Sequence, residues 1–85
     1  MKIEPEYNLL ALLGAVIRRR RQYLGLSQEE LAAKAGLNRS YIGDIERGTR
    51  NLALLNISRL ASALEMKPSQ LIILAEKRGD RKGSR

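Results

Sequence analysis

Apolar residues recur at helical spacing in several stretches of the chain, and each stretch is bounded by residues that start or stop helices. The pattern predicts helices over about residues 8–24, 28–35, 39–47, 54–64 and 69–77. No stretch shows the strict alternation that is typical of a strand. The sequence therefore predicts an all-α fold with five helices.

The second and third predicted helices are short and are separated by a glycine turn. Ser27 and Glu30 have the spacing of a capping box at the start of the second helix, and Gly36 accepts the left-handed conformation that ends it. Asn38 is placed to cap the third helix, and Gly48 to end it. This punctuation predicts a helix, a tight turn and a second helix.

The third predicted helix has one apolar and one polar face. With Ile42 and Ile45 turned toward a core, at about 100° per residue, the opposite face carries small or polar residues. Such a helix can enter the major groove of DNA, where its N-terminal residues reach base edges and a glycine permits close approach. The outward residues are Ser40, Gly43, Asp44 and Arg47, with Arg39 and Tyr41 on the flanks.

At these residues the chain resembles the helix-turn-helix of phage repressor and Cro-type regulators, the bacterial family often called xenobiotic-response-element-like (XRE). Ala32, Gly36, Ile42 and Ile45 match its packing positions, and the similarity extends from LGLSQEELA through IERGTRN to KPSQLI. The run NRSYIGDIERGTRNL resembles most the small controller proteins of restriction-modification systems, which are homodimers that activate or repress their own operon. The resemblance implies a five-helix repressor-type DNA-binding domain with a central helix-turn-helix.

The length of 85 residues fits one domain. We expect an N-terminal extension over 1–7, the helix-turn-helix domain over 8–78 and a basic disordered tail over 79–85. The chain has no cysteine and no histidine, which excludes disulfides, thiol nucleophiles and the ordinary zinc sites, and we expect no metal or cofactor. The apolar run from Leu9 to Ile17 is too short to span a membrane, so we expect a cytoplasmic protein without membrane contact.

The net charge of +7 is typical of proteins that bind polyanions, but the charge is unevenly distributed. Counting basic minus acidic side chains, residues 1–25 carry +3, residues 26–52 carry 0 and residues 53–85 carry +4. The predicted helix-turn-helix, which lies within residues 26–52, is therefore neutral. Its affinity for phosphates has to come from individually placed residues and from basic surroundings.

The arginine run from Arg18 to Arg21 cannot form one stripe on a helix. Arg18 and Arg19 should face solvent, whereas Arg20 and Arg21 flank the core. We expect Arg20 to extend its guanidinium outward over an apolar stem. Glu46 lies beside the buried stripe of the third helix, and in the family the matching glutamate commonly pairs with an arginine of the first helix. We therefore predict that Arg21 pairs with Glu46, which would orient the third helix.

Each candidate contact with DNA has a structural alternative. Gln28 resembles the family glutamine that binds a phosphate at a helix N-terminus, or else it is an exposed helix former. Arg39 and Ser40 are the candidates for base edges, with a phosphate contact as the alternative for Arg39. The Tyr41 hydroxyl is expected at sugar or phosphate, and its alternative is packing against the fourth helix.

Arg50 and Asn51 follow the reading helix, and in controller-like relatives these positions contact DNA. We predict that Arg50 reads a base, while Asn51 either contacts DNA or caps the loop that leads into the fourth helix. The complete set of candidate DNA-binding residues is Gln28, Asn38, Arg39, Ser40, Tyr41, Gly43, Asp44, Arg47, Thr49, Arg50 and Asn51.

The fifth predicted helix is apolar around most of its circumference, because Leu71, Ile72, Ile73 and Leu74 are consecutive. One small domain cannot easily bury all four side chains. We therefore expect a symmetric homodimer through the fourth and fifth helices. The alternative is that Ile72 or Ile73 is a lone exposed apolar residue, which needs no partner.

Together these features predict a sequence-specific regulator of transcription that binds a pseudo-palindromic double-stranded DNA operator as a homodimer. The alternative is an antitoxin or a phage or plasmid repressor that also binds a protein, and a toxin or RNA polymerase is the further partner considered. We do not expect an enzyme, because Glu29, Glu30 and Glu46 have structural positions and Asp44 stands alone. RNA binding is disfavoured because the only aromatic side chains are three tyrosines.

Overall fold

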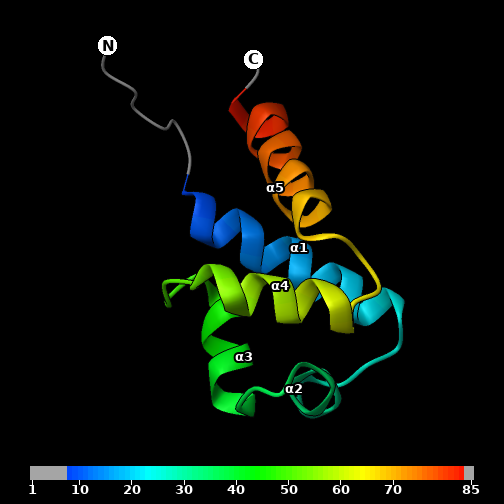
Figure 1. The fold of residues 1–85 in the computed structure, drawn as a ribbon. Coiled ribbons are helices and arrows are strands. Elements are labelled where there is room, and N and C mark those ends of the chain that lie inside the picture. The colour runs from blue at the N-terminus through cyan, green and yellow to red at the C-terminus, as the bar shows by residue number, and fades with distance from the viewer. Residues whose placement is uncertain (1–7, 84–85) are drawn as a thin grey trace.

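The computed structural model describes residues 8–83, and this part of the chain folds into five α-helices without strands. The all-α prediction is thereby confirmed, whereas the expected extension over 1–7 lies outside the described residues. Figure 1 shows α1 running through the middle, with α5 on one side of it and α2 and α3 on the other. The helices are α1 (Leu9–Tyr23), α2 (Gln28–Ala35), α3 (Arg39–Arg47), α4 (Leu54–Ala63) and α5 (Pro68–Gly83).

Side-chain caps and glycines explain where the first three helices begin and end. The Ser27 hydroxyl accepts from the Glu30 amide at 3.0 Å, and the Glu30 carboxylate accepts from the Ser27 amide at 2.8 Å. The hydrogen bonds from the Ser27 backbone and then its side chain lower the pKa of Glu30. Gly36 and Gly48 end α2 and α3 in the left-handed region, with φ of 69° and 73°. The predicted helix-turn-helix punctuation is present.

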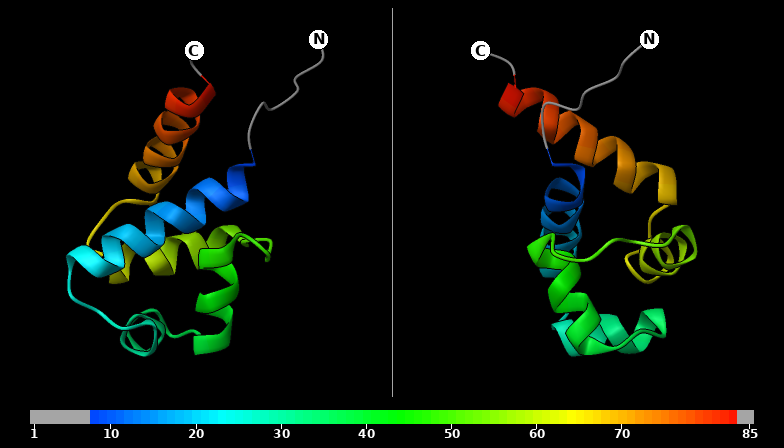
Figure 2. Two further views of the ribbon diagram at one scale, coloured as in Figure 1. Left: turned by 180° about the vertical axis from the view of Figure 1, so that it is seen from behind. Right: turned by 90° about the vertical axis from the view of Figure 1, so that its left-hand side faces the viewer.

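The end of α4 departs from this pattern, because the left-handed position after it is a glutamate. Glu65 has a φ of 61°, and the Met66 amide donates to the Ala61 carbonyl at 2.8 Å to close the turn. A residue with a β-carbon is strained in this conformation. After this turn the chain enters α5, which lies across α1 (Figure 2).

One hydrophobic core lies between the helices, and every helix contributes to it. Burial of such side chains is the main force that holds a small domain together, at about 1.5–3 kcal/mol for each large one. The largest fully buried side chains are Ile17, Leu31, Ile42, Ile45, Leu60, Leu64 and Leu71.

Helices α1 and α3 approach so closely that glycine is required between them. A β-carbon at Gly14 would collide with the backbone carbonyl oxygen of Ile45. A β-carbon at Gly48 would lie 2.7 Å from the Cα atom of Ala11. The position of α3 is therefore set by backbone contact as well as by side-chain packing.

Helix α5 is longer than predicted and corrects the expected disordered tail. It continues to Gly83, so residues 79–83 are helical, and only 84–85 of the proposed tail lie outside the described residues. Leu71, Ala75 and Gly79 repeat every four residues and are all buried. This packed stripe favours the helix beyond the point where local composition predicts its end.

Arg20 also differs from its prediction, because its guanidinium turns toward the protein. Its Nε atom donates to the Leu64 carbonyl oxygen at 3.0 Å, and the guanidinium lies 5.1 Å from the centre of the Tyr23 ring. The last carbonyls of a helix have no partner within it, and a cation is favourable at that end. The expected outward extension of Arg20 is therefore wrong: the side chain caps α4.

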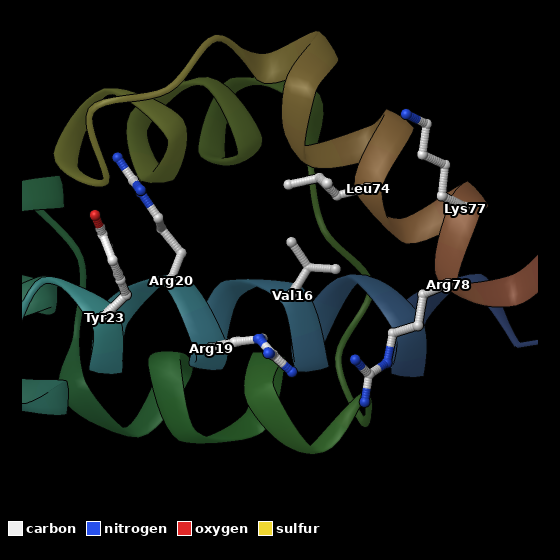
Figure 3. A pocket seen from close by; sticks show the side chains of 7 residues that line it. All are labelled: Val16, Arg19, Arg20, Tyr23, Leu74, Lys77 and Arg78. Carbon is white, nitrogen blue, oxygen red and sulfur yellow. The ribbon is translucent and has the colours of Figure 1, made fainter. Parts of the chain in front are cut away.

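A groove of about 420 Å³ runs between α1 and α5, on the side of α1 away from α2 and α3. Figure 3 shows Val16 of α1 and Leu74 of α5 facing one another across it. Its remaining lining is Arg19, Arg20, Tyr23, Lys77 and Arg78. None of the described helices has the length and apolar character that crossing a bilayer requires.

Candidate nucleic-acid interface

The outward face of α3 lies at the end of the molecule formed by α2 and α3 (Figure 1). Ile42 and Ile45 are buried and attach this helix to the core, as predicted. Arg39 and Ser40 are exposed at its first turn. The helix therefore presents polar side chains outward on a rigid, packed base.

A half-buried charged cluster joins α1, α2 and α3 behind this face. Arg21 donates to Glu46 twice, from Nε at 2.7 Å and from Nη2 at 3.0 Å, and from Nη1 to the Leu26 carbonyl at 2.8 Å. The two side chains are only 12% and 4% exposed. The hydrogen bond with Glu46 raises the pKa of Arg21, so the guanidinium keeps its charge. The structure thus contains the ion pair expected between these residues.

Gln28 belongs to the same cluster as Arg21 and Glu46. Its amide Nε2 donates to Glu46 Oε1 at 3.0 Å, so the side chain is held rather than freely exposed. The amide carries two protons, and this bond uses one of them. Gln28 is the first residue of α2, and the backbone amides at that end of the helix also favour an anion. The geometry thus leaves Gln28 able to donate to a phosphate.

A second charged cluster lies on the outward face of α3 itself. The Asp44 carboxylate accepts from Arg47 Nη2 at 2.6 Å and from Arg50 Nη2 at 3.1 Å. Thr49 Oγ1 donates to the Asp44 carbonyl oxygen at 3.1 Å. A β-carbon at Gly43 would lie 3.3 Å from Arg47 Nη1, so that guanidinium covers the glycine. Gly43 is therefore buried, which differs from the prediction that it would be open to close approach by DNA.

Tyr41 packs within the protein, as its structural alternative predicted, and its hydroxyl proton remains available. Its oxygen accepts from Asn56 Nδ2 of α4 at 2.9 Å, and its ring packs against the core. The Arg50 guanidinium lies 5.2 Å from the ring centre. A phenol that accepts one hydrogen bond still has its own proton to donate. Tyr41 is thus anchored to α4 and still able to bind an acceptor such as a phosphate oxygen.

The two asparagines near α3, Asn38 and Asn51, have different contacts. Asn38 Oδ1 accepts from the Ser40 amide at 2.7 Å, so its side chain caps α3. The predicted capping alternative for Asn51 is wrong, because Ala53 occupies the N-cap of α4 and makes no side-chain cap. Asn51 is exposed in the loop between α3 and α4.

An open hollow lies between the N-terminal ends of α2 and α3. Its lining includes Arg39, Gln28 and Ser27, together with Glu29 and Arg21. Both helix N-termini carry partial positive charge, to which the two arginines add. This combination favours an anion there, against the opposing charge of Glu29.

The predicted dimer surface is only partly available. Leu71 is completely buried in the core of its own chain, which removes it from any interface, and Ile72 is half-buried. Ile73 and Leu74 are 47% and 43% exposed. The four consecutive residues point around the helix, so the core takes one of them and leaves others at the surface.

Two side-chain contacts were not predicted. Asn56 holds Tyr41 beside this interface, whereas Arg20, outside it, binds the end of α4. An asparagine in a helix looks like an ordinary solvent-facing residue in the sequence, and no spacing rule connects it to Tyr41. For Arg20, its place beside the core was the available signal.

Comparison with known proteins agrees with this architecture. A family model described as helix-turn-helix matches residues 17–71. The control protein C.BamHI of Bacillus amyloliquefaciens is 44% identical over 66 residues, which cover 76% of this chain and 82% of that protein. The crystal structure of the restriction-modification controller protein C.AhdI from Aeromonas hydrophila has a TM-score of 0.74 and 49% identity, covering 76% and 98% of the two chains.

A further solved structure shows a relative with DNA. The restriction-modification controller protein C.Esp1396I, crystallised as a tetramer with its natural 35 base-pair operator, has a TM-score of 0.78 and 34% identity, covering 87% of this chain and 97% of that one. Both the family match and these relatives cover most of the chain. The protein therefore belongs to the helix-turn-helix family and is similar, within it, to the controller proteins of restriction-modification systems.

Proposed function

We propose that this protein is a sequence-specific regulator of transcription that binds a pseudo-palindromic double-stranded DNA operator as a homodimer. The observation that carries the proposal is α3, which is packed through Ile42 and Ile45 and presents polar residues outward. A relative of the same fold has been crystallised on its operator. The controller proteins of restriction-modification systems are the subclass that we propose.

In this proposal, phosphate contacts position the protein and base contacts specify the sequence. Gln28 and Tyr41 each retain a proton that can be donated to a phosphate oxygen. Arg39 and Ser40 lie exposed at the start of α3, where a helix in the major groove reaches base edges. A guanidinium can bond O6 and N7 of guanine together, so we assign a guanine to Arg39.

Dimerisation is the second part of the proposal. Exposed apolar side chains of α4 and α5, namely those of Leu54, Leu55, Ile73 and Leu74, support an interface between two copies. A two-fold dimer would place two α3 helices on half-sites one turn of DNA apart. The tetramer of C.Esp1396I is an assembly of a relative, and we propose only the dimer here.

We propose that the protein acts by binding alone, in the cytoplasm, rather than as an enzyme. Three acidic side chains near α3 already have partners: Glu30 is in the capping box, Glu46 binds Arg21, and Asp44 binds two arginines. In the described part of the chain, no three acidic residues gather as a metal site would require. A toxin or RNA polymerase as further partner is the alternative that co-purification tests.

The experiment is a selection of bound sequences from a random duplex pool, followed by binding of the selected duplex at several salt concentrations. An inverted repeat with half-sites about 10 base pairs apart is expected. Failure to enrich any sequence, with affinity that falls uniformly as salt rises, would show nonspecific binding and contradict the proposal.

Two variants separate the proposed roles of base and phosphate contacts. Arg39→Ala should lose discrimination at defined base pairs, by about 1–3 kcal/mol, because it removes a base contact. Gln28→Ala should weaken binding to all duplexes alike, since a phosphate carries no sequence information. Equal, uniform losses in both variants would contradict the assignment of Arg39.

A further inference from the structure

We infer that Asp44 is a positioning residue for sequence specificity: it holds Arg47 and Arg50 in place on the reading face and opposes their use on DNA of other sequences. The inference rests on the proposed function and deepens it, because it names what sets the selectivity of that surface. Asp44 carries a carboxylate on a surface that would face a polyanion.

The geometry makes Asp44 the shared partner of two cations. Its Oδ1 accepts from Arg47 at 2.6 Å and its Oδ2 from Arg50 at 3.1 Å, so each oxygen serves one guanidinium. Asp44 is 29% exposed, whereas the arginines are 64% and 53% exposed. The carboxylate is thus partly covered by the side chains that it holds, and those side chains remain accessible to DNA.

Each arginine also has a second support that is independent of Asp44. Arg50 lies over the ring of Tyr41, and Asn56 of α4 holds the hydroxyl of that tyrosine. Arg47 lies across Gly43, where the absence of a side chain gives it room. Both guanidinium groups therefore have a contact on the protein besides the one with Asp44. Arginines that are already ordered lose less rotamer freedom on reaching a base edge.

The same carboxylate acts against binding to the DNA backbone. The two arginines carry a charge of +2, and with Asp44 the three side chains together carry +1. Nonspecific binding depends on cations that neutralise phosphates, and a nearby carboxylate repels those phosphates. An arginine that moves to a phosphate also has to leave Asp44. Asp44 therefore lowers affinity for any duplex, while the arginines stay placed for one sequence.

The test compares Asp44→Asn with Glu76→Gln, which removes one negative charge from an exposed position on α5, far along the chain from the reading helix. Dissociation constants are measured by fluorescence anisotropy for the selected operator and for a random duplex, at several salt concentrations. For Asp44→Asn we expect tighter binding to the random duplex and a ratio of the two constants reduced by about tenfold. The slope of log K against log salt should steepen by about 1 for each arginine released to phosphate.

A second background tests whether Asp44 acts through the arginines. In a variant with both Arg47→Ala and Arg50→Ala, adding Asp44→Asn should leave the specificity ratio unchanged. A further loss of specificity there would overturn the inference, because Asp44 would then contact DNA directly. The Asp44–arginine pairs are largely exposed, so all these variants should fold, and their melting curves check this.

The outcomes separate this inference from the proposed function. If the wild-type protein binds the selected and random duplexes equally, the proposed function fails, and the inference with it. If the wild type discriminates but Asp44→Asn keeps both the ratio and the affinity for random DNA, only the inference is overturned. An equal change in Glu76→Gln would also overturn it, since net charge alone would then explain the result.

Discussion

Replacing Glu46 with leucine removes the acceptor that joins α1, α2 and α3 while keeping most of the side-chain volume. In the folded protein Glu46 accepts from Arg21 twice and from Gln28 once, and it is almost fully buried. The variant leaves the Arg21 charge without its carboxylate in a largely buried position. The expected loss in the free energy of unfolding is therefore dominated by an unpaired buried charge.

The magnitude follows from what remains around Arg21. Removing one partner of a buried ion pair costs about 3–5 kcal/mol. Arg21 is 12% exposed and keeps its bond to the Leu26 carbonyl, so we expect the lower end, about 3 kcal/mol. A domain of 85 residues has a total stability of about 4–13 kcal/mol. The melting temperature should fall by about 12–24 °C.

The assay is urea and thermal unfolding followed by circular dichroism at several protein concentrations, on Glu46→Leu, Arg21→Met and the double variant. The double variant should cost no more than either single one, because neither charge is then buried alone. As a control, Arg47→Met breaks an exposed pair and should cost less than about 1 kcal/mol. Single losses below about 1 kcal/mol, or a double loss equal to their sum, would refute the reasoning.

Three further predictions concern the helix ends. Glu65→Gly should stabilise the protein by about 0.5–1 kcal/mol in urea unfolding, because it removes the left-handed strain at an exposed position, and no gain would contradict that strain. Gly48→Ala should destabilise it by about 2–4 kcal/mol, through the same conformation and the collision with Ala11, whereas Gly25→Ala, with open space around it, should cost less. The lowered pKa of Glu30 means that its capping contribution is complete above the ordinary glutamate pKa and is lost as the pH falls through the folded-state value. The difference in unfolding free energy between wild type and Glu30→Gln should therefore shrink in acid, and a constant difference from about pH 7 to pH 3 would disprove this role.

Local signals in the sequence were sufficient for the helix-turn-helix. Helices α2 and α3 begin and end at the predicted residues, which are Ser27, Gly36, Asn38 and Gly48. These signals suffice because caps and left-handed glycines depend on neighbouring residues. The periodicity that assigned Ile42 to the core was also sufficient, since α3 has one strongly apolar face.

Most features that depend on contacts between distant residues could not be predicted from the sequence. The length of α5 follows from its packing on α1, and the burial of Leu71 follows from where that helix crosses the core. The end of α4 at Glu65 has no residue signal, because a glutamate rarely takes that conformation. Of the clusters around Glu46 and Asp44, only the Arg21–Glu46 pair was predicted. The contact of Gln28 with Glu46 and both arginine contacts of Asp44 emerged from the folded geometry.

The attachment of α3 has a consequence for how such a protein can change its target. Ile42, Ile45 and Glu46 face the interior, and Gly14 on α1 meets the backbone of α3 rather than a particular side chain. On the outward face, Asp44 binds Arg47 and Arg50, and these contacts leave the interior ones untouched. Under the proposed function, exchange of the outward residues of α3 would change the DNA sequence that the protein binds, while the interior contacts that hold the helix stay the same.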